Sequence, residues 1–321
     1  MPLIHQSSYH APFLLRNGDL QTIYPTIMRK LSPARYQRER IDTPDDDFLD
    51  LDWSRAGSRK LVILSHGLEG STYRHYMIGM AIQMNKYGWD ALAWNYRGCS
   101  GENNRRLRMY HNGCIDDLDC VVRHALRTGM YDTVALIGFS LGGNLTLMYL
   151  GSIADALDAR IRRSVVISVP CDLKAGATQL AKMKNCLYMK QFLSSLHKKI
   201  KLKMEQMPGE INDDGYERIR DFKGFDDRYT APIHGFRNGE DYWEKCSSNR
   251  FLSAIRIPTL IVNALDDPFL SVACFPIEQA RNSRYVHLEM PVHGGHVGFV
   301  QFNEDESYWS ENRTVEFFGQ G

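Results

Sequence analysis

Short apolar runs recur along the chain and are separated by longer stretches in which apolar residues follow helical spacing. The runs are rich in Val, Ile, Leu and Ala, which is typical of strands buried in a parallel sheet. The predicted strands are Lys60–Ser65, Trp89–Asn95, Val134–Ile137, Ser164–Val169, Thr259–Ala264 and Tyr285–Met290. Helical spacing covers about 74–87, 112–128, 145–150 and 306–318. Strands that alternate with helices in this way predict an α/β fold, with a mostly parallel sheet and helices on both faces.

Three segments depart from this alternation. Residues 48–53 alternate apolar and polar side chains, which predicts a half-exposed strand at the edge of the sheet. Residues 1–45 mix polar and aromatic residues with several prolines, and we expect an irregular arm. Residues 172–250 contain no convincing strand and lie between two predicted strands. We therefore expect them to form a helical cap inserted over the carboxyl edge of the sheet.

Lysines are interspersed among Met, Leu, Ile and Phe from Lys182 to Met207 of this cap. A solvated basic face on a cap helix is the ordinary interpretation, and a helix that contacts a membrane surface is the alternative. The apolar residues of the same stretch are too many for a solvated loop. We expect some of them, including Leu187 and Phe192, to line a substrate pocket.

The composition narrows the class of protein. The chain has 321 residues, 43% of them hydrophobic, and a net charge of +1. This length accommodates one large domain with an insertion, which we favour, or two domains. The balanced charge gives no indication of nucleic acid as a partner. Seven cysteines without paired spacing predict neither a disulfide framework nor a zinc site, and we expect no metal and no cofactor.

Segments that would place the protein in a membrane or export it are not evident. No apolar run approaches the ~18 residues that a membrane span requires. The first residues lack the basic and then apolar regions of a signal peptide. Together with the scattered cysteines, these features predict a cytoplasmic protein.

The apolar run that ends at Ile137 leads into Gly138-Phe-Ser-Leu-Gly142, a G-x-S-x-G sequence between a predicted strand and a predicted helix. In that context the serine lies on a turn so tight that its neighbours must be glycine. Such a turn exposes the Oγ of Ser140 at the carboxyl edge of the sheet and directs the amide of Leu141 into the same space. A glycine-rich turn with an inert serine has the same pattern, so a nucleophilic role requires an acid and a base elsewhere.

A serine hydroxyl needs a base to take its proton, and the base needs a carboxylate to orient it. In this arrangement the acid and then the histidine follow the serine, each after a later strand. Both places hold a doublet: Asp266 and Asp267, and His293 and His296. We predict Asp267, because its turn directs the carboxylate along the sheet edge, with Asp266 capping that turn. We predict His296, because two preceding glycines permit a sharp loop that presents it.

Two backbone amides are needed to stabilise the oxyanion of an acyl-transfer reaction. We predict those of Leu141 and Leu68, the second in the loop that begins at His66 after an early strand. His66 and Arg97 both follow strands at this edge and are candidates for contact with substrate. For Arg97 the alternative is a structural loop held by hydrogen bonds of Arg97 and Glu102.

Several motifs resemble those of the YheT-like α/β-hydrolases, a family that includes mammalian abhydrolase-domain lipases and yeast medium-chain ethyl-ester synthases. The motifs are His66–Ser71, Arg97–Glu102, Gly138–Asn144, Asn263–Pro268 and His293–Phe299, with Leu20–Thr22 in the arm and Ile233–Phe236 in the cap. The resemblance implies the α/β-hydrolase fold and a triad of Ser140, Asp267 and His296. It also implies ester hydrolysis or acyl transfer on lipid-like or short acyl substrates. The mammalian members carry an amino-terminal membrane anchor that this sequence does not contain.

These observations predict a serine carboxylesterase that acts on a small-molecule ester with a short to medium acyl chain. Ser140 would form an acyl-enzyme, and water would then release the acyl group. An acyltransferase with the same triad, in which an alcohol replaces water, is one alternative. A non-catalytic acyl-binding protein on a hydrolase scaffold is the other. The physiological ester and the oligomeric state are left open.

Overall fold

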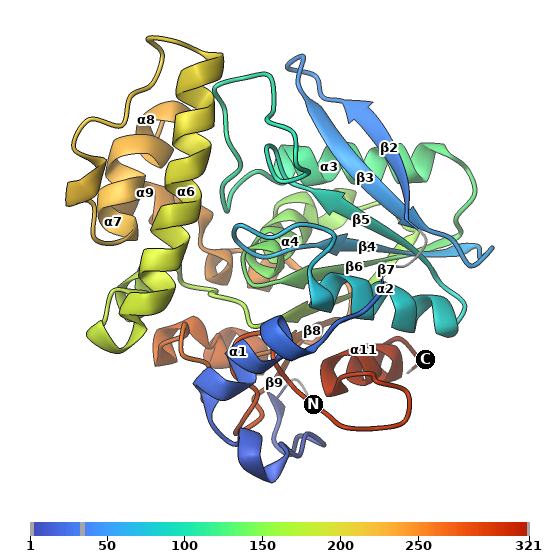
Figure 1. Ribbon diagram of the computed structural model, residues 1–321. Helices are drawn as coiled ribbons and strands as arrows, with labels where there is room; N and C mark the ends of the chain where they lie inside the picture. The colour runs from blue at the N-terminus through green and yellow to red at the C-terminus, as the bar shows by residue number, and fades with distance from the viewer. Residues whose placement is uncertain (1–2, 33–35, 320–321) are drawn as a thin grey trace.

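A single sheet forms the centre of the computed structural model, which describes residues 3–32 and 36–319 (Figure 1). Within these ranges the strands are β1 (Leu3–Ile4), β2 (Gln37–Asp42), β3 (Phe48–Ser54), β4 (Lys60–Ser65), β5 (Asp90–Asn95), β6 (Thr133–Phe139), β7 (Ile161–Ile167), β8 (Thr259–Val262) and β9 (Val286–Glu289). Their order in the sheet is β1-β9-β8-β7-β6-β4-β5-β3-β2. β3 is antiparallel to both β2 and β5, and the other neighbours are parallel. The predicted mostly parallel α/β sheet is confirmed.

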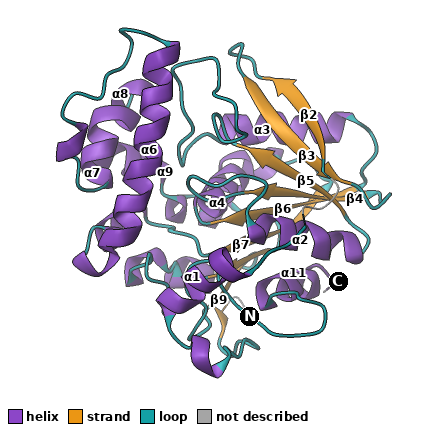
Figure 2. Ribbon diagram, viewed as in Figure 1, coloured by secondary structure: helices purple, strands orange, loops and turns teal. Residues whose placement is uncertain are grey.

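Helices cover both faces of this sheet (Figure 2). They are α2 (His75–Lys86), α3 (Ile115–Arg127), α4 (Leu141–Ile153), α10 (Ile277–Arg281) and α11 (Trp309–Gly319). Successive side chains of a strand point to opposite faces, as β4 illustrates. Leu61 and Ile63 pack in the core on the side of α3 and α4, whereas Val62 and Leu64 pack on the side of α2 and α11. The continuous apolar runs of the sequence reflect this burial on both sides.

Residues 172–250 form helices between β7 and β8. The helices are α5 (Leu173–Leu180), α6 (Cys186–Gln206), α7 (Phe222–Phe225), α8 (Ala231–His234) and α9 (Gly239–Cys246). Figure 1 shows them as a separate layer at one end of the sheet, with α6 the long helix on the left. Their inner side chains, among them Leu193, Leu196 and Ile200 of α6, form a hydrophobic cluster that also includes Met109 and Phe269 from outside the segment.

The amino-terminal segment is more regular than we expected. Residues 18–28 form helix α1 (Gly18–Met28), and 37–42 form the edge strand β2. The side chain of Asn17 caps α1 by accepting hydrogen bonds from the amides of Asp19 and Leu20, at 3.0 and 3.1 Å. Residues 1–2 and 33–35 of the expected arm lie outside the described residues.

Strand β3 is buried along its whole length and is not the edge strand that its alternating pattern predicts. The acidic side chains on its polar face form ion pairs with arginines of the neighbouring strand β2, which is the edge strand. Arg38 pairs with Asp52 at 2.8 Å, and Arg40 pairs with Asp50 at 2.7 Å. The alternation therefore reports a polar face buried by charge pairing, which the pattern alone does not distinguish from a face in water.

Candidate active site

Ser140 lies on the turn between β6 and α4 with φ +53° and ψ −115°, a region that side chains rarely occupy. The glycines around it are required by close packing. A Cβ on Gly138 would lie 2.3 Å from the carbonyl oxygen of Gly142, and a Cβ on Gly142 would lie 2.3 Å from that of Ser65. The amide of Ser140 donates to Ile167 of the neighbouring strand at 2.9 Å. These contacts fix a strained turn that holds the serine at the carboxyl edge of the sheet.

A chain of hydrogen bonds joins Ser140, His296 and Asp267. His296 Nε2 is 2.9 Å from Ser140 Oγ, and His296 Nδ1 is 2.8 Å from Asp267 Oδ2. In the tautomer protonated on Nδ1, the histidine donates to the carboxylate and accepts from the serine. The second carboxylate oxygen accepts from the amide of Phe269 at 2.8 Å. Burial raises the pKa of Asp267, while the neighbouring His296 acts in the opposite direction.

The other member of each doublet forms a separate pair. His293 Nδ1 lies 3.2 Å from Asp266 Oδ2, and the second oxygen of Asp266 accepts from the amide of Gly295 at 2.9 Å. This pair braces the loop that carries His296. Neither residue is hydrogen-bonded to Ser140. The two doublets therefore divide into an Asp267–His296 pair that reaches Ser140 and an Asp266–His293 pair that does not.

Residues that the sequence interpretation did not assign hold the His296 loop in place. Thr22 Oγ1, on α1, accepts a hydrogen bond from the amide of His296 at 2.9 Å. Gln21, fully buried, accepts from the amide of Val300 through Oε1 at 2.9 Å. Ser168 Oγ accepts from the amide of Val297 at 2.8 Å. The only sequence signal for the first two was the Leu20–Thr22 motif in the arm.

The loop after β4 and the first turn of α4 provide the two predicted oxyanion amides. The amide of Gly67 donates to the hydroxyl of Tyr76 at 3.1 Å, and the amide of Glu69 donates to the hydroxyl of Tyr110 at 2.9 Å. Leu68, between them, and Leu141 both line the cavity that contains Ser140 and His296. Flanking amides that are engaged elsewhere fix the loop around Leu68.

A cavity of about 130 Å³ opens from Ser140 into the space beneath the helices of 172–250. The same measure of volume gives only ~15 Å³ for a single water molecule, so the cavity is several times larger than one water. Most of its wall is apolar and comes from α5, α6, α7 and α9: Leu173, Ala177, Leu180, Phe192, Leu196, Phe222, Phe225 and Trp243. Phe269, whose ring centroid is 4.2 Å from that of His296, forms the wall nearest the catalytic loop. This shape suits an apolar chain attached to a group held at Ser140.

Of the pocket residues that we predicted, the structure brings only Phe192 to this cavity. Leu187 does not line it, because its side chain lies on the outer side of α6 and is 78% exposed. His66 is completely buried beneath the turn, where its Nδ1 faces the carbonyl of Gly67 at 2.8 Å. Tyr96 donates its amide to the second ring nitrogen at 3.3 Å, and burial lowers the pKa of His66 to about 3. His66 is a neutral structural residue.

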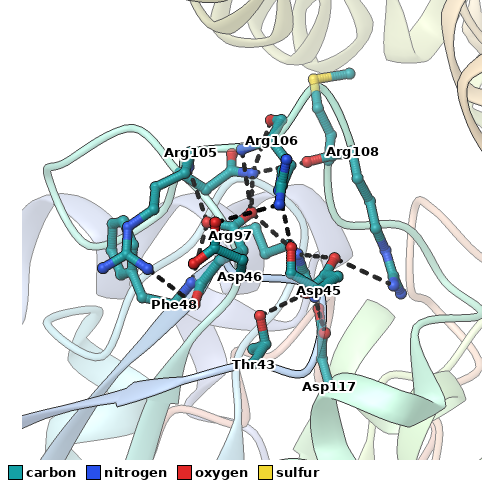
Figure 3. A network of polar contacts seen from close by, with 12 residues as sticks. Thr43, Asp45, Asp46, Phe48, Arg97, Arg105, Arg106, Arg108 and Asp117 are labelled. Atoms are coloured by element: carbon teal, nitrogen blue, oxygen red, sulfur yellow. Dashed lines mark hydrogen bonds and ion pairs between the residues drawn. The ribbon is translucent and has the colours of Figure 1, made fainter.

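Arg97 is also withdrawn from the cavity, and its guanidinium is buried among carboxylates (Figure 3). It pairs with Asp117 at 2.7 Å, with Asp45 at 2.8 Å and with Asp47 at 3.0 Å. Glu102, at the other end of the same loop, pairs with Arg40. The structural alternative for Arg97 therefore describes its position, and the carboxylates that hold it come from the turn between β2 and β3 and from α3.

Two lysines of α6 face inward. The expectation that the lysines of this helix form a solvated basic face therefore does not hold for these two. Lys203 is 1% exposed and donates to the carbonyl oxygens of Asn104, at 2.6 Å, and of Arg106. Burial lowers the pKa of Lys203 to about 8. Lys199 pairs at 2.9 Å with Glu69, which follows Leu68 in the loop after β4. The remaining lysines of α6 are exposed. The inward pair ties α6 to the loops that surround Ser140.

Comparisons with known proteins identify the family of the chain. The model of the family Hydrolase_4, described as serine aminopeptidase, S33, matches residues 56–273. The putative esterase YheT of Escherichia coli (strain K12) is 34% identical over 290 residues, which cover 88% of this chain and 84% of YheT. This chain belongs to the YheT-like α/β-hydrolases. The resemblance that the sequence motifs indicated is thereby confirmed.

More distant relatives place this hydrolase in the esterase and lipase type. Phospholipase ABHD3 of Mus musculus is 29% identical over 310 residues, covering 94% of this chain and 75% of that protein. The esterase Pf2001 of Pyrococcus furiosus superposes with a TM-score of 0.61 at 18% identity, covering 96% and 98% of the two chains. At that identity the second comparison supports the α/β-hydrolase fold alone.

In the part of the chain that the structure describes, no group of three or more His, Cys, Asp or Glu side chains is arranged to hold a metal ion.

Proposed function

We propose that this hydrolase is a serine carboxylesterase that cleaves short- to medium-chain acyl esters through an acyl-enzyme on Ser140. The observation that carries the proposal is the continuous hydrogen-bonded chain from Ser140 through His296 to the buried Asp267. His296 takes the serine proton as Oγ attacks the ester carbonyl, and then gives it to the leaving alkoxide. Asp267 keeps the imidazole oriented and stabilises its charged form. A water molecule, activated by the same histidine, then hydrolyses the acyl-enzyme.

The oxyanion of each tetrahedral intermediate is assigned to the amides of Leu68 and Leu141. Two such donors act on charge that develops only in the transition state, and removing one typically costs ~10²–10³-fold in kcat. Both residues line the cavity beside Ser140, which supports the assignment. Because the donors are backbone groups, side-chain substitutions at these positions test it weakly.

The acyl group is assigned to the apolar cavity, with residues 172–250 acting as the cap that encloses it. The wall near Ser140 includes Phe192, Leu180 and Leu196 from the cap. Each methylene buried there contributes about 0.8 kcal/mol, or about fourfold in kcat/KM, until the cavity is full. We therefore expect kcat/KM to rise with acyl length through short and medium chains and then to fall.

An aminopeptidase, as the family description would allow, is less well supported by this cavity. Such an enzyme must recognise a free α-ammonium group, for which a carboxylate is the natural partner. Asp226 is the carboxylate in the cavity wall, and it accepts hydrogen bonds from Thr230 at 2.6 Å and from Trp243 at 2.7 Å. Burial raises the pKa of Asp226 to about 7. A carboxyl that is engaged and partly protonated is a poor ammonium receptor.

The experiment is a series of p-nitrophenyl esters from two to sixteen carbons, assayed with the wild type and with Ser140→Ala. We expect a maximum at short or medium length and a loss of ~10⁴–10⁶-fold in the variant. The same assay with added ethanol separates hydrolysis from acyl transfer, because a transferase gives mainly ethyl ester. Equal turnover by Ser140→Ala would contradict the proposal. Specific binding of acyl chains without turnover would favour the non-catalytic alternative.

A further inference from the structure

Helix α1 packs on the catalytic loops through one face and leaves an apolar face uncovered. The inward face carries Gly18 and Gln21, which are buried. Leu20, Ile23 and Ile27 occupy the opposite face at helical spacing and are 49%, 42% and 62% exposed. A surface helix ordinarily presents charged and polar side chains on its outer face. The outer face of α1 is apolar instead, which is typical of a helix face that packs against another surface.

The apolar surface continues on both sides of the helix. Phe13 and Leu14, in the turn before α1, are at least 78% exposed. Met183 and Leu187, at the amino-terminal end of α6, are likewise at least 78% exposed. These four side chains and the outer face of α1 are together called the α1 patch. An exposed apolar surface of this kind marks an interaction site when its residues are contiguous.

A hydrogen bond between α6 and α1 links the two parts of the patch, and Tyr188, which donates it, leads toward the active site. The hydroxyl of Tyr188, on α6, donates to Asp19 of α1 at 3.0 Å, and Figure 1 shows α1 beside the lower end of α6. The ring of Tyr188 packs on Phe269 with centroids 4.8 Å apart. Phe269 in turn contacts His296 and lines the cavity. A single side chain thus separates the patch from the cavity wall.

Positive charges surround the patch and select among possible partners. The exposed cations within or next to its two segments are Arg16, Lys30, Lys182, Lys184 and Lys190. None of them forms a salt bridge with a carboxylate among the described residues. Asp19, the one acidic residue in 13–30, is held by Tyr188, and 182–190 contain no acid. The two segments of the patch therefore combine apolar side chains with cations that no acidic residue within those segments balances.

We propose that the α1 patch docks on an anionic lipid surface. Apolar side chains that enter the headgroup region, flanked by lysines and arginines that face anionic lipid, are the composition of an interfacial helix. A second copy of the chain fits less well, because a two-fold contact would bring the same cations together. No helix in 3–32 and 36–319 is long and apolar enough to span a bilayer, so this contact is at the surface. Insofar as it brings lipid-like esters to Ser140, the inference rests on the proposed function.

Sedimentation with lipid vesicles tests this proposal without catalysis. The full-length Ser140→Ala protein is mixed with vesicles of phosphatidylcholine, with or without phosphatidylserine. We expect binding to the anionic vesicles that weakens as NaCl is raised. The double variant Ile23→Asp/Ile27→Asp should lose at least about tenfold in partition coefficient. The matched control, Ile82→Asp/Met130→Asp, changes side chains that are 41% and 48% exposed elsewhere and should bind as the parent does.

The outcomes separate this proposal from its alternatives and from the proposed function. Lys182→Glu/Lys184→Glu leaves α1 untouched and should also weaken binding, which guards against misfolding of the helix variant. In the Ser140-containing protein, Ile23→Asp/Ile27→Asp should retain hydrolysis of a soluble short-chain ester. Equal vesicle binding by parent and patch variants would overturn the proposal, as would a dimer that the substitutions abolish without any vesicle binding. A wild type that binds vesicles but cleaves no ester would remove the proposed function and leave the docking surface standing.

Discussion

Replacing Thr22 by valine tests how the amino-terminal helix positions the candidate base. Thr22 Oγ1 accepts from the amide of His296 at 2.9 Å and donates to the carbonyl of Gly18 at 2.6 Å. Valine keeps the shape of the side chain but has no oxygen. The amide of His296 is then left without its partner, in a loop whose position sets the distance from the imidazole to Ser140.

The size of the effect follows from the cost of an unsatisfied donor, which is about 1–3 kcal/mol when the group is buried. This hydrogen bond is only partly buried, so we take the lower half, about 1–2 kcal/mol. If the loop relaxes away from Ser140 to recover that energy, kcat falls by about 5–30-fold. KM should change little, because Thr22 does not line the cavity.

The assay is steady-state kinetics with a short-chain ester on the wild type, Thr22→Val and Thr22→Ser. Serine restores the acceptor oxygen and should recover most of kcat. Thr26→Val, at an exposed threonine of the same helix, controls for the loss of a helical threonine. A lower melting temperature for Thr22→Val with unchanged kcat would refute the reasoning, since the residue would then stabilise the fold without positioning the base.

Three further predictions concern the carboxyl groups and the cap. Asp267→Asn should abolish turnover while Asp266→Asn keeps most of it, and equal losses in kcat would mean that both carboxylates contribute. Because burial raises the pKa of Asp226 to about 7, the folded protein retains a proton that the unfolded chain releases between about pH 4 and 7. Denaturant titrations should show the wild type losing up to about 4 kcal/mol relative to Asp226→Asn as the pH rises through this range, and a pH-independent difference would contradict that. Phe192→Trp should shorten the preferred acyl chain in the ester series, whereas Leu187→Trp, on the outer side of α6, should leave it unchanged.

The sequence was informative where a residue's role depends on local backbone geometry. Gly138 and Gly142 are dictated by carbonyl oxygens closer than 2.5 Å to where a Cβ would lie, and the G-x-S-x-G pattern reports that directly. Ser140, Asp267 and His296 follow β6, β8 and β9, and the carboxyl ends of these parallel strands lie at one edge of the sheet. The choice of Asp267 over Asp266 and of His296 over His293 rested on the turn residues and on the family resemblance.

The sequence was uninformative where a role depends on distant partners. Nothing local distinguishes the buried Lys203 from the exposed lysines of α6, because its burial arises from carbonyls about a hundred residues away. Arg97 bonds carboxylates from two other segments. Nothing in the mixed polar and aromatic segment around Thr22 indicates that it packs on the loop of His296, 274 residues away along the chain. Leu187 and Phe192 differ in the side of α6 that they occupy, because Phe192 lines the cavity and Leu187 is exposed.

Covalent labelling tests most directly whether Ser140 is a nucleophile that His296 activates. The full-length protein is treated with a fluorophosphonate, and the adduct is located by peptide mass spectrometry, with Ser140→Ala and His296→Ala as controls. The account predicts one adduct, on Ser140, that is absent from the first variant and forms far more slowly in the second. An adduct on another residue, or labelling of Ser140 that is equally fast without His296, would contradict it.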